Sequence, residues 1–219
     1  MLHAIFKSVP AEERTLVLRQ QRLITLADNQ ALLTVGQSCS EAFFVASGRI
    51  RIETPVGPAA FALTGALRPL EIYIEQLGQA QYAASNTLRA MMASTVNVIP
   101  LSVLQSLVLK YPDVGFELLQ HGFGGVKRLR QGLRRVKSEP ARTQVARTLY
   151  DVAVPTSDGG RVLERGITQS DLADFTGLSR EAVNKELRLL SEASLVRKSS
   201  RGMEIDPLLA STDFLPWND

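Results

Sequence analysis

The chain has 219 residues, 45% of them hydrophobic, and its formal net charge is only +3. This composition is typical of one or two packed domains and excludes a disordered chain. No stretch approaches the roughly 18–20 apolar residues that a membrane helix needs, and charged residues at 12–14 exclude a secretory signal, so we expect a cytoplasmic protein without a membrane partner.

The pattern of the N-terminal half changes from helical to strand-like at about residue 23. The first 20 or so residues have the amphipathic spacing of a helix. Residues 49–53 then alternate between charged side chains and isoleucine directly after Gly48. Alternation beside a glycine predicts antiparallel strands with tight turns, and residues 87–101 repeat the strand pattern. Residues 23–100 therefore predict a small β-barrel or sandwich.

A helical period returns after Pro100. Residues 101–111 predict a helix, which Pro112 ends while suiting the start of the next one. The following helix of about 25 residues carries a narrow apolar stripe. The stripe consists of Phe116, Leu119, Phe123, Val126, Leu129 and Leu133. Its glycines each cost up to about 1 kcal/mol relative to alanine, so the helix needs a packing partner. We expect the seam of a two-helix dimer; packing on the chain's own barrel is the alternative.

The remainder of the chain is predicted to be a compact helical unit that ends in a pair of strands. A helix over residues 138–154 has Ser138 or Glu139 near its N-cap and Pro140 in its first turn, and a loop follows. Residues 195–205 predict two short strands around a basic turn. Beside a helical unit, such a pair indicates a wing whose cations suit a phosphate backbone.

The stretch TQSDLADFTGLSREAVNKELRLL, residues 168–190, predicts a helix-turn-helix. Thr168 and Asp171 have the spacing of a capping box, and Gly177 permits a left-handed residue that ends the first helix. Ser179 is placed to cap the second helix, and the small Ala173 lets the two helices cross closely. The apolar side of the second helix consists of Val183, Leu187 and Leu190.

In a helix-turn-helix, the N-terminal residues of the second helix enter the DNA major groove. Arg180 can donate twice to guanine, and Glu181 can accept from cytosine. We expect base contacts from Arg180, Glu181, Asn184 and Lys185. We expect phosphate contacts, which fix register rather than sequence, from Thr168, Gln169, Ser179, Arg188, Arg197, Lys198, Ser199 and Arg201.

The order of these elements resembles the Crp/Fnr family of bacterial transcription factors, named after the cyclic-AMP receptor protein and the fumarate–nitrate regulator. The resemblance covers nearly the whole chain and is strongest over residues 167–201, where Ser-Arg-Glu-x-Val at 179–183 matches the recognition helix. It implies an α+β protein with three parts. These are an N-terminal β-roll like that of cyclic-nucleotide-binding domains (residues 1–111), a dimerisation helix (112–137) and a C-terminal winged helix-turn-helix (138–219).

The same resemblance implies a homodimer that binds a near-palindromic site on double-stranded DNA. It also implies a contact with RNA polymerase, for which the family uses the loop corresponding to residues 156–160.

Relatives that bind cyclic nucleotides hold the phosphate with an arginine, and Ala84 takes that position here. Residues 69–88 contain no lysine or arginine, so no cation in this stretch neutralises its two acidic residues, Glu71 and Glu75. Cyclic AMP is therefore not expected to bind, and the effector is unknown or absent.

Several alternatives remain open from the sequence. His121 or His3 would be needed for a haem-sensing regulator, and Cys39 for a redox sensor, although packed structural roles are expected for all three. Cys39 is the single cysteine, which excludes an internal disulfide and a multi-cysteine metal site. Another alternative is an interaction scaffold that reuses the winged helix without DNA. The chain has no GxSxG elbow, paired-histidine metal site or phosphate-binding glycine loop, so neither an enzyme nor a cofactor or metal is expected.

Overall fold

The computed structural model describes residues 3–57, 60–156, 160–164, 167–200 and 202–210, without the side chains at 128, 131–133, 135–138, 164 and 210. The chain divides into two compact units, Met1–Leu129 and Arg130–Asp219. The boundary lies inside the long helix α3 (Pro112–Ser138).

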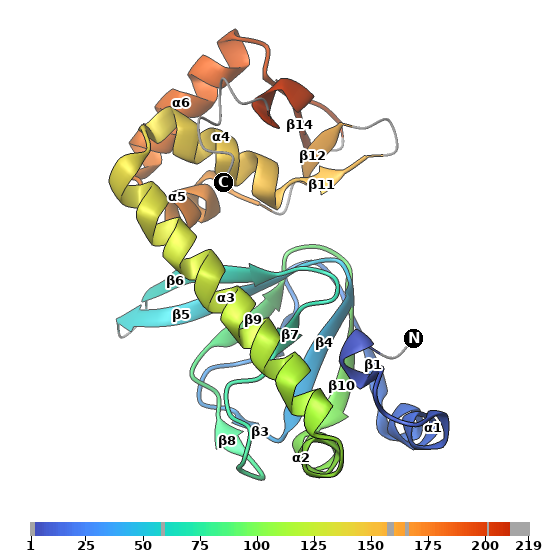
Figure 1. The fold of residues 1–219 in the computed structure, drawn as a ribbon. Coiled ribbons are helices and arrows are strands. Elements are labelled where there is room, and N and C mark those ends of the chain that lie inside the picture. Colours follow the sequence, from blue (N-terminus) through green and yellow to red (C-terminus); the bar gives the residue numbers. More distant parts are fainter. Residues whose placement is uncertain (1–2, 58–59, 157–159, 165–166, 201, 211–219) are drawn as a thin grey trace. The chain divides into compact units, whose positions relative to one another are not determined.

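The N-terminal unit is an antiparallel β-roll followed by helices (Figure 1). One four-stranded sheet has the order β1-β10-β4-β7, a second has the order β2-β9-β5-β6, and β3 pairs with β8. The strands are β1 (Arg22–Leu26), β2 (Ala31–Leu33), β3 (Ser38–Cys39), β4 (Glu41–Ser47), β5 (Ile50–Gly57), β6 (Ala60–Leu67), β7 (Ile72–Tyr73), β8 (Tyr82–Ala83), β9 (Thr87–Ala90) and β10 (Ser94–Pro100). The predicted small barrel or sandwich is thus confirmed.

The core of the roll lies between its sheets and α2 (Leu101–Lys110). Strand β4 is buried along Ala42–Val45, and Leu101 and Leu104 of α2 are fully buried in the same cluster. Each fully buried leucine or phenylalanine stabilises the fold by roughly 1.5–3 kcal/mol. This core anchors the start of α3, where Val114 is also fully buried.

The helix predicted for the first 20 residues is interrupted. A 3₁₀ turn, η1 (Ala4–Phe6), comes first, and α1 (Ala11–Gln20) begins only after Pro10. Proline lacks an N–H and disfavours the helical conformation of the residue before it, so one continuous helix cannot form across this position.

The two histidines and the cysteine have packed positions in this unit. The His3 ring packs at a tilt against Phe44 and edge-on against His121, with ring centroids 5.5 and 5.2 Å apart. His3 Nδ1 accepts the Ile5 amide at 3.3 Å, so Nε2 carries the proton that is donated to the Leu70 carbonyl at 2.9 Å. Cys39 is buried, and its thiol lies 3.5 Å from the Glu41 carbonyl oxygen.

The turn between β4 and β5 depends on Gly48. Its φ of +79° is the left-handed conformation that favours glycine. The Ser94 hydroxyl accepts the Arg49 amide at 3.0 Å and lies beneath the turn. A Cβ at position 48 would overlap that hydroxyl and lie 2.7 Å from the Ala93 carbonyl oxygen.

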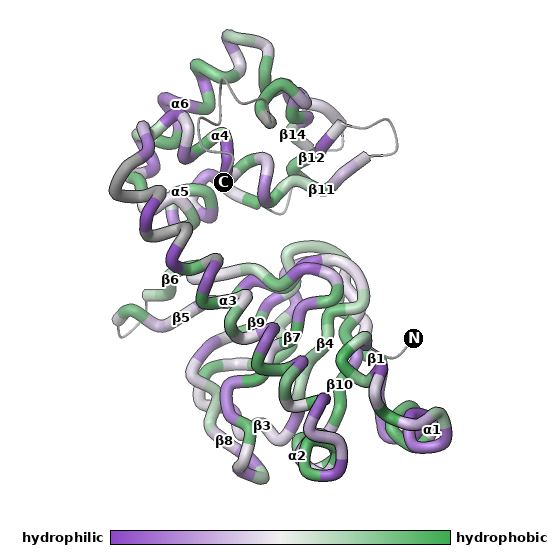
Figure 2. The backbone as a smooth tube through the Cα atoms, viewed as in Figure 1, coloured by the Kyte–Doolittle hydropathy of each residue, from purple (hydrophilic) through white to green (hydrophobic). Residues whose placement is uncertain are grey.

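Helix α3 has one packed and one exposed apolar face, and Figure 2 shows hydrophobic and hydrophilic segments alternating along it. Its length of 27 residues confirms the predicted long helix. The predicted stripe is exposed, from 45% for Val126 to 68% for Phe123, and Gly122 and Gly125 face open space. The stripe residues Phe116, Leu119, Phe123, Val126 and Leu129 are all exposed, whereas the Leu133 side chain lies outside the described residues. No helix in the described part of the chain is both long and apolar enough to cross a bilayer.

The C-terminal unit packs three helices against a four-stranded sheet of order β11-β12-β14-β13. Helix α4 begins at Ala141 with Pro140 as its N-cap, so Ser138 belongs to α3 rather than to the cap predicted for it. Strands β11 and β12 are additions to the predicted pair of strands. The elements are α4 (Ala141–Val152), β11 (Val154–Pro155), β12 (Arg161–Glu164), α5 (Gln169–Thr176), α6 (Arg180–Glu192), β13 (Val196–Lys198), β14 (Gly202–Ile205) and η2 (Pro207–Ala210).

We expect Gly48→Ala to lower the free energy of unfolding by about 3 kcal/mol, because the methyl group adds a steric clash to the unfavourable φ. Gly36 is the matched control, since its φ is +80° but no atom lies within 4 Å of the position that a methyl group would take there. Gly36→Ala should cost only about 1–2 kcal/mol. Urea denaturation of both variants measures the difference, and equal losses would contradict the role of Ser94.

Candidate nucleic-acid interface

A capping box begins α5. The Thr168 hydroxyl accepts the Asp171 amide at 3.1 Å, and Asp171 Oδ2 accepts the Thr168 amide at 2.7 Å. Two N–H groups that a helix N-terminus leaves without partners are therefore satisfied. The Thr168 hydroxyl also donates to Asp171 Oδ2 at 2.8 Å, so its proton is used within the protein.

The turn after α5 has the predicted left-handed glycine. Gly177 has a φ of +70°, and its amide donates to the Ala173 carbonyl at 2.8 Å. The buried Thr176 hydroxyl donates to the Leu172 carbonyl at 2.7 Å, which satisfies a polar group inside the core. Leu178, in the turn, packs against the hydrophobic core of the C-terminal unit. This geometry confirms the predicted helix-turn-helix.

Helix α6 is fixed by its apolar side. Val183, Leu187 and Leu190 are buried against α4 and α5, as predicted. The Ser179 hydroxyl caps the helix by accepting the Ala182 amide at 3.2 Å. One ion pair that holds α6 against α4 was not predicted from the sequence: Arg142 on α4 pairs with Glu186 on α6, with Nε and Oε2 3.1 Å apart. Ion pairs between helices 44 residues apart leave no local signal in the sequence.

The opposite side of α6 presents the four residues expected to contact bases. Arg180, Glu181, Asn184 and Lys185 are all exposed. Residues four apart lie above each other on a helix, so Arg180 and Asn184 form one row and Glu181 and Lys185 the next. The Glu181 amide and the Ser179 hydroxyl donate to the Glu181 carboxylate and hold its pKa below the usual range. The start of the helix thus combines a cation with an ionised acceptor.

The residues expected to contact phosphates occupy several elements. Gln169 and Ser179 lie at the starts of α5 and α6, and Arg188 Nε lies 3.6 Å from Glu192 Oε1 on α6. In the wing, the Ser199 amide donates to the Gly202 carbonyl at 2.7 Å and closes the turn between β13 and β14. Arg201 lies outside the described residues.

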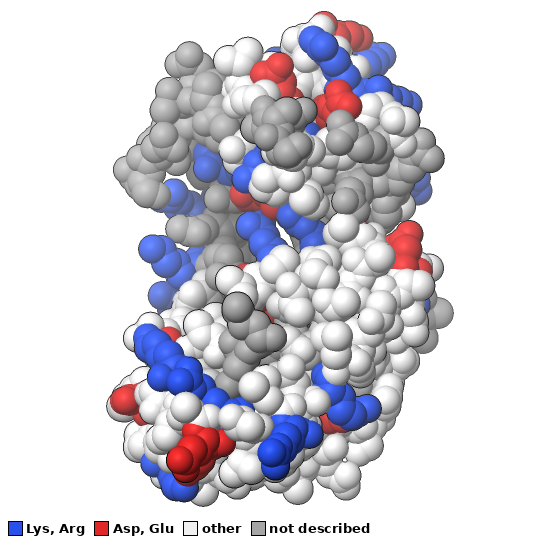
Figure 3. Space-filling model, turned by 90° about the vertical axis from the view of Figure 1, so that its right-hand side faces the viewer, with Lys and Arg blue, Asp and Glu red and all other residues white. Residues whose placement is uncertain are grey.

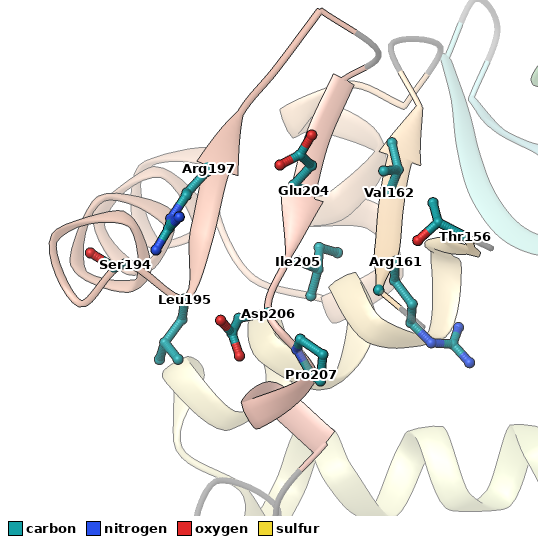
Figure 4. Close-up of a pocket in the computed structure, with 11 residues that line it drawn as sticks. Thr156, Arg161, Val162, Ser194, Leu195, Arg197, Glu204, Ile205, Asp206 and Pro207 are labelled. Atoms are coloured by element: carbon teal, nitrogen blue, oxygen red, sulfur yellow. The ribbon is translucent and has the colours of Figure 1, made fainter. Parts of the chain in front are cut away.

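Arg197 and Lys198 are exposed on β13, but neighbouring residues of a strand point to opposite faces. Arg197 pairs across the sheet with Glu204, which in turn pairs with Val162. These residues line an open cavity of about 210 Å³ that Figure 4 shows. On the face visible in Figure 3, basic and acidic side chains are mixed at the upper end of the C-terminal unit. The acidic Glu204 beside Arg197 was not predicted, because it becomes a neighbour only through strand pairing.

Arg161 is a second residue whose role the sequence did not indicate. Its Nη1 donates to the carbonyls of Tyr150 and Ala153, at 2.9 and 3.0 Å, and its guanidinium lies 4.0 Å from the centroid of the Tyr150 ring. In Figure 4 the side chain points away from Glu204 and Asp206. Arg161 therefore satisfies carbonyls at the C-terminal end of α4, consistent with a structural role.

Comparison with known proteins agrees with this geometry. The sequence profile of the Crp-like helix-turn-helix domain matches residues 143–208, which include α5, α6 and both strands of the wing. Residues 143–208 thus form a Crp-like helix-turn-helix domain. A curated relative is the protein named "Probable transcriptional regulator flp" of Lacticaseibacillus casei, with 24% identity over 115 residues. That match covers 52% of this chain and 52% of the relative, so it spans about half the length of each.

Solved structures show that the Crp/Fnr fold extends over nearly the whole chain. FixK2 from Bradyrhizobium japonicum has a TM-score of 0.75 at 14% identity, covering 91% of this chain and 98% of its own. A CRP/FNR-family regulator from Thermus thermophilus has a TM-score of 0.68 at 18% identity, covering 90% and 100%. The c-di-GMP responsive regulator CLP of Xanthomonas campestris has a TM-score of 0.65 at 19% identity, covering 90% and 99%. The predicted fold class, a β-roll with a long helix and a winged helix-turn-helix, is confirmed.

Thr168→Ala should lower the free energy of unfolding by about 1 kcal/mol, because the capping box loses the hydroxyl that accepts the Asp171 amide. Thr168→Ser keeps the hydroxyl and should remain within about 0.5 kcal/mol of the unchanged protein. Thermal unfolding followed by circular dichroism measures both. Equal losses in the two variants would show that the threonine methyl group, and not the cap, is important.

Proposed function

We propose that this chain is a sequence-specific DNA-binding transcription regulator of the Crp/Fnr family. The observation that supports it is the division of α6 into a buried side, centred on Val183 and Leu187, and an exposed side that begins with Arg180 and Glu181. A helix docked in this way presents donors and acceptors that match base edges in the major groove. The wing adds exposed cations that suit phosphates.

The proposed regulator acts as a homodimer whose seam is the exposed stripe of α3. Five large apolar side chains on one helix face are typical of a surface that another protein covers. A second copy of the same helix provides a matching stripe, and two-fold symmetry then places two α6 helices for a near-palindromic site. The glycines at 122 and 125 leave room for a close approach of the second helix.

We propose that neither cyclic AMP nor haem is the effector. Ala84, at the position where relatives that bind cyclic nucleotides have an arginine, is a buried residue without charge. Both ring nitrogens of His3 are used in hydrogen bonds within the protein, which leaves neither available for iron. The other candidate haem ligand, His121, packs its ring edge-on against His3, with centroids 5.2 Å apart. A contact with RNA polymerase through residues 156–160 is also proposed; residues 157–159 lie outside the described residues.

The proposal is tested by selecting bound sequences from a random pool of double-stranded DNA. A regulator should enrich one near-palindromic motif, and its affinity should fall steeply with salt. An interaction scaffold that reuses the winged helix would enrich no motif and show a shallow salt dependence. That result would refute the proposed function.

Arg180→Ala should weaken binding to the selected site by about 1–3 kcal/mol and relax the preference at one base pair of each half-site. Arg197→Ala is the matched control, because loss of a phosphate contact should weaken all sequences alike and reduce the salt slope by about one. Binding titrations on the site and on single-base variants measure both effects. If Arg180→Ala weakened all sequences equally, a phosphate contact would replace the proposed base contact.

Phe123→Glu should convert the dimer into monomers and remove most of the DNA affinity, because a charge would be buried in an apolar seam. Leu109→Glu is the matched control: Leu109 on α2 is 84% exposed and does not belong to the stripe. Sedimentation velocity of both variants measures the oligomeric state. A dimeric Phe123→Glu variant would place the interface elsewhere.

A further inference from the structure

Three hydrogen-bond donors converge on the carboxylate of Glu75, two residues after β7 in the N-terminal unit. The Ser85 amide donates to Oε2 at 2.8 Å, Asn86 Nδ2 donates to Oε1 at 3.2 Å, and the Tyr73 hydroxyl donates to Oε1. Residues 69–88 contain no lysine or arginine, so this stretch binds the carboxylate through neutral donors. Such a set of donors is an anion-binding arrangement whose anion belongs to the chain itself.

The same network extends into the other sheet of the roll. Asn86 Oδ1 accepts a hydrogen bond from the Thr54 hydroxyl on β5 at 2.6 Å. The Thr64 hydroxyl on β6 lies 2.7 Å from the Thr54 hydroxyl and extends the network to a third strand. Tyr73 belongs to the sheet of β7, whereas β5 and β6 belong to the sheet of β9. The Glu75 carboxylate is therefore at the junction of the two four-stranded sheets.

The ionised form of Glu75 is the one that these donors stabilise. Partial burial by itself raises the pKa of the carboxyl group, but hydrogen bonds from Tyr73, Ser85 and Asn86 outweigh it and hold the pKa below its usual range. Burial and the nearby carboxylate raise the pKa of Tyr73, which keeps its hydroxyl protonated as a donor. The network is thus consistent with a permanent anion at this position.

We infer that Glu75 is an internal ligand of the β-roll: its carboxylate occupies an anion site formed by Ser85, Asn86 and Tyr73 and joins the two sheets without an external small molecule. If the glutamate side chain is removed, the same donors should bind a small external carboxylate. The inference concerns the N-terminal unit alone and stands apart from the proposed binding of DNA.

The test is rescue of Glu75→Ala by sodium acetate in the full chain. The variant should unfold about 5 °C below the unchanged protein, because three donors lose their acceptor. About 100 mM sodium acetate should recover at least half of that loss relative to sodium chloride of equal ionic strength. If the variant does not fold in chloride, acetate should restore its folded circular dichroism spectrum, and failure to do so would overturn the inference.

Two controls separate a specific site from a general effect of salt. Glu71 lies in the same stretch and accepts the Arg68 amide at 2.9 Å in an exposed turn, so Glu71→Ala should gain no more from acetate than the unchanged protein. Glu75→Gln keeps the site filled without its charge and should lose stability that acetate does not restore. Because the folded-state pKa of Glu75 lies below its ordinary value of 4.5, this loss should be complete above about pH 4.5 and disappear as the pH falls further.

Equal acetate gains in Glu75→Ala and Glu71→Ala would overturn the inference, as would an unchanged melting temperature in Glu75→Ala. A second measurement adds cyclic AMP to the unchanged protein. A filled anion site should leave the melting temperature where it is, and a saturable rise would show that an external phosphate enters the roll and would contradict the internal ligand.

Discussion

The candidate interface depends on the burial of one side of α6. Val183, Leu187 and Leu190 contribute roughly 1.5–3 kcal/mol each when buried, whereas each N-cap contributes about 1 kcal/mol. The partly exposed ion pair between Arg142 and Glu186 adds at most about 1 kcal/mol. Burial of apolar side chains therefore contributes more free energy to the docking of α6 than the caps or the ion pair do. Since a helix has about 3.6 residues per turn, burying this side determines which side chains remain outside.

The polar contacts around α5 and α6 determine where the helices begin and end. Thr168 and Ser179 satisfy amides at the two N-termini, and Gly177 allows the chain to reverse between them. Without these residues the helices could slide by a residue or fray, and a shift of one position would turn Arg180 by about 100° around the helix axis. Apolar contacts thus provide most of the free energy that holds the helices together, whereas the caps fix the residue at which each helix begins.

Local features of the sequence were sufficient to predict the capping box, the glycine turn after the first helix of the helix-turn-helix, and the strands that meet at the Gly48 turn. Each of these depends on residues close in the chain. Strand β12 was not predicted: its four residues are too few for a period, and its pairing with β14 joins segments about 40 residues apart. The contact of Arg142 with Glu186 was missed for the same reason. The partners of Glu75 are closer in the chain, but the turns that bring Ser85 and Asn86 to its carboxylate follow no period in the sequence. Ser138 was misplaced because α3 continues to the residue before Glu139, a boundary that the helical period does not mark.

The exposed stripe of α3 has a consequence for how such a regulator would respond to its own abundance. In the proposed dimer, the species that binds DNA forms from two chains, so its concentration rises with the square of the monomer concentration while monomers predominate. Occupancy of an operator would then be sigmoidal in protein level even with no small molecule present. The apolar side chains of one helix face would thereby set the threshold at which synthesis of the protein changes transcription.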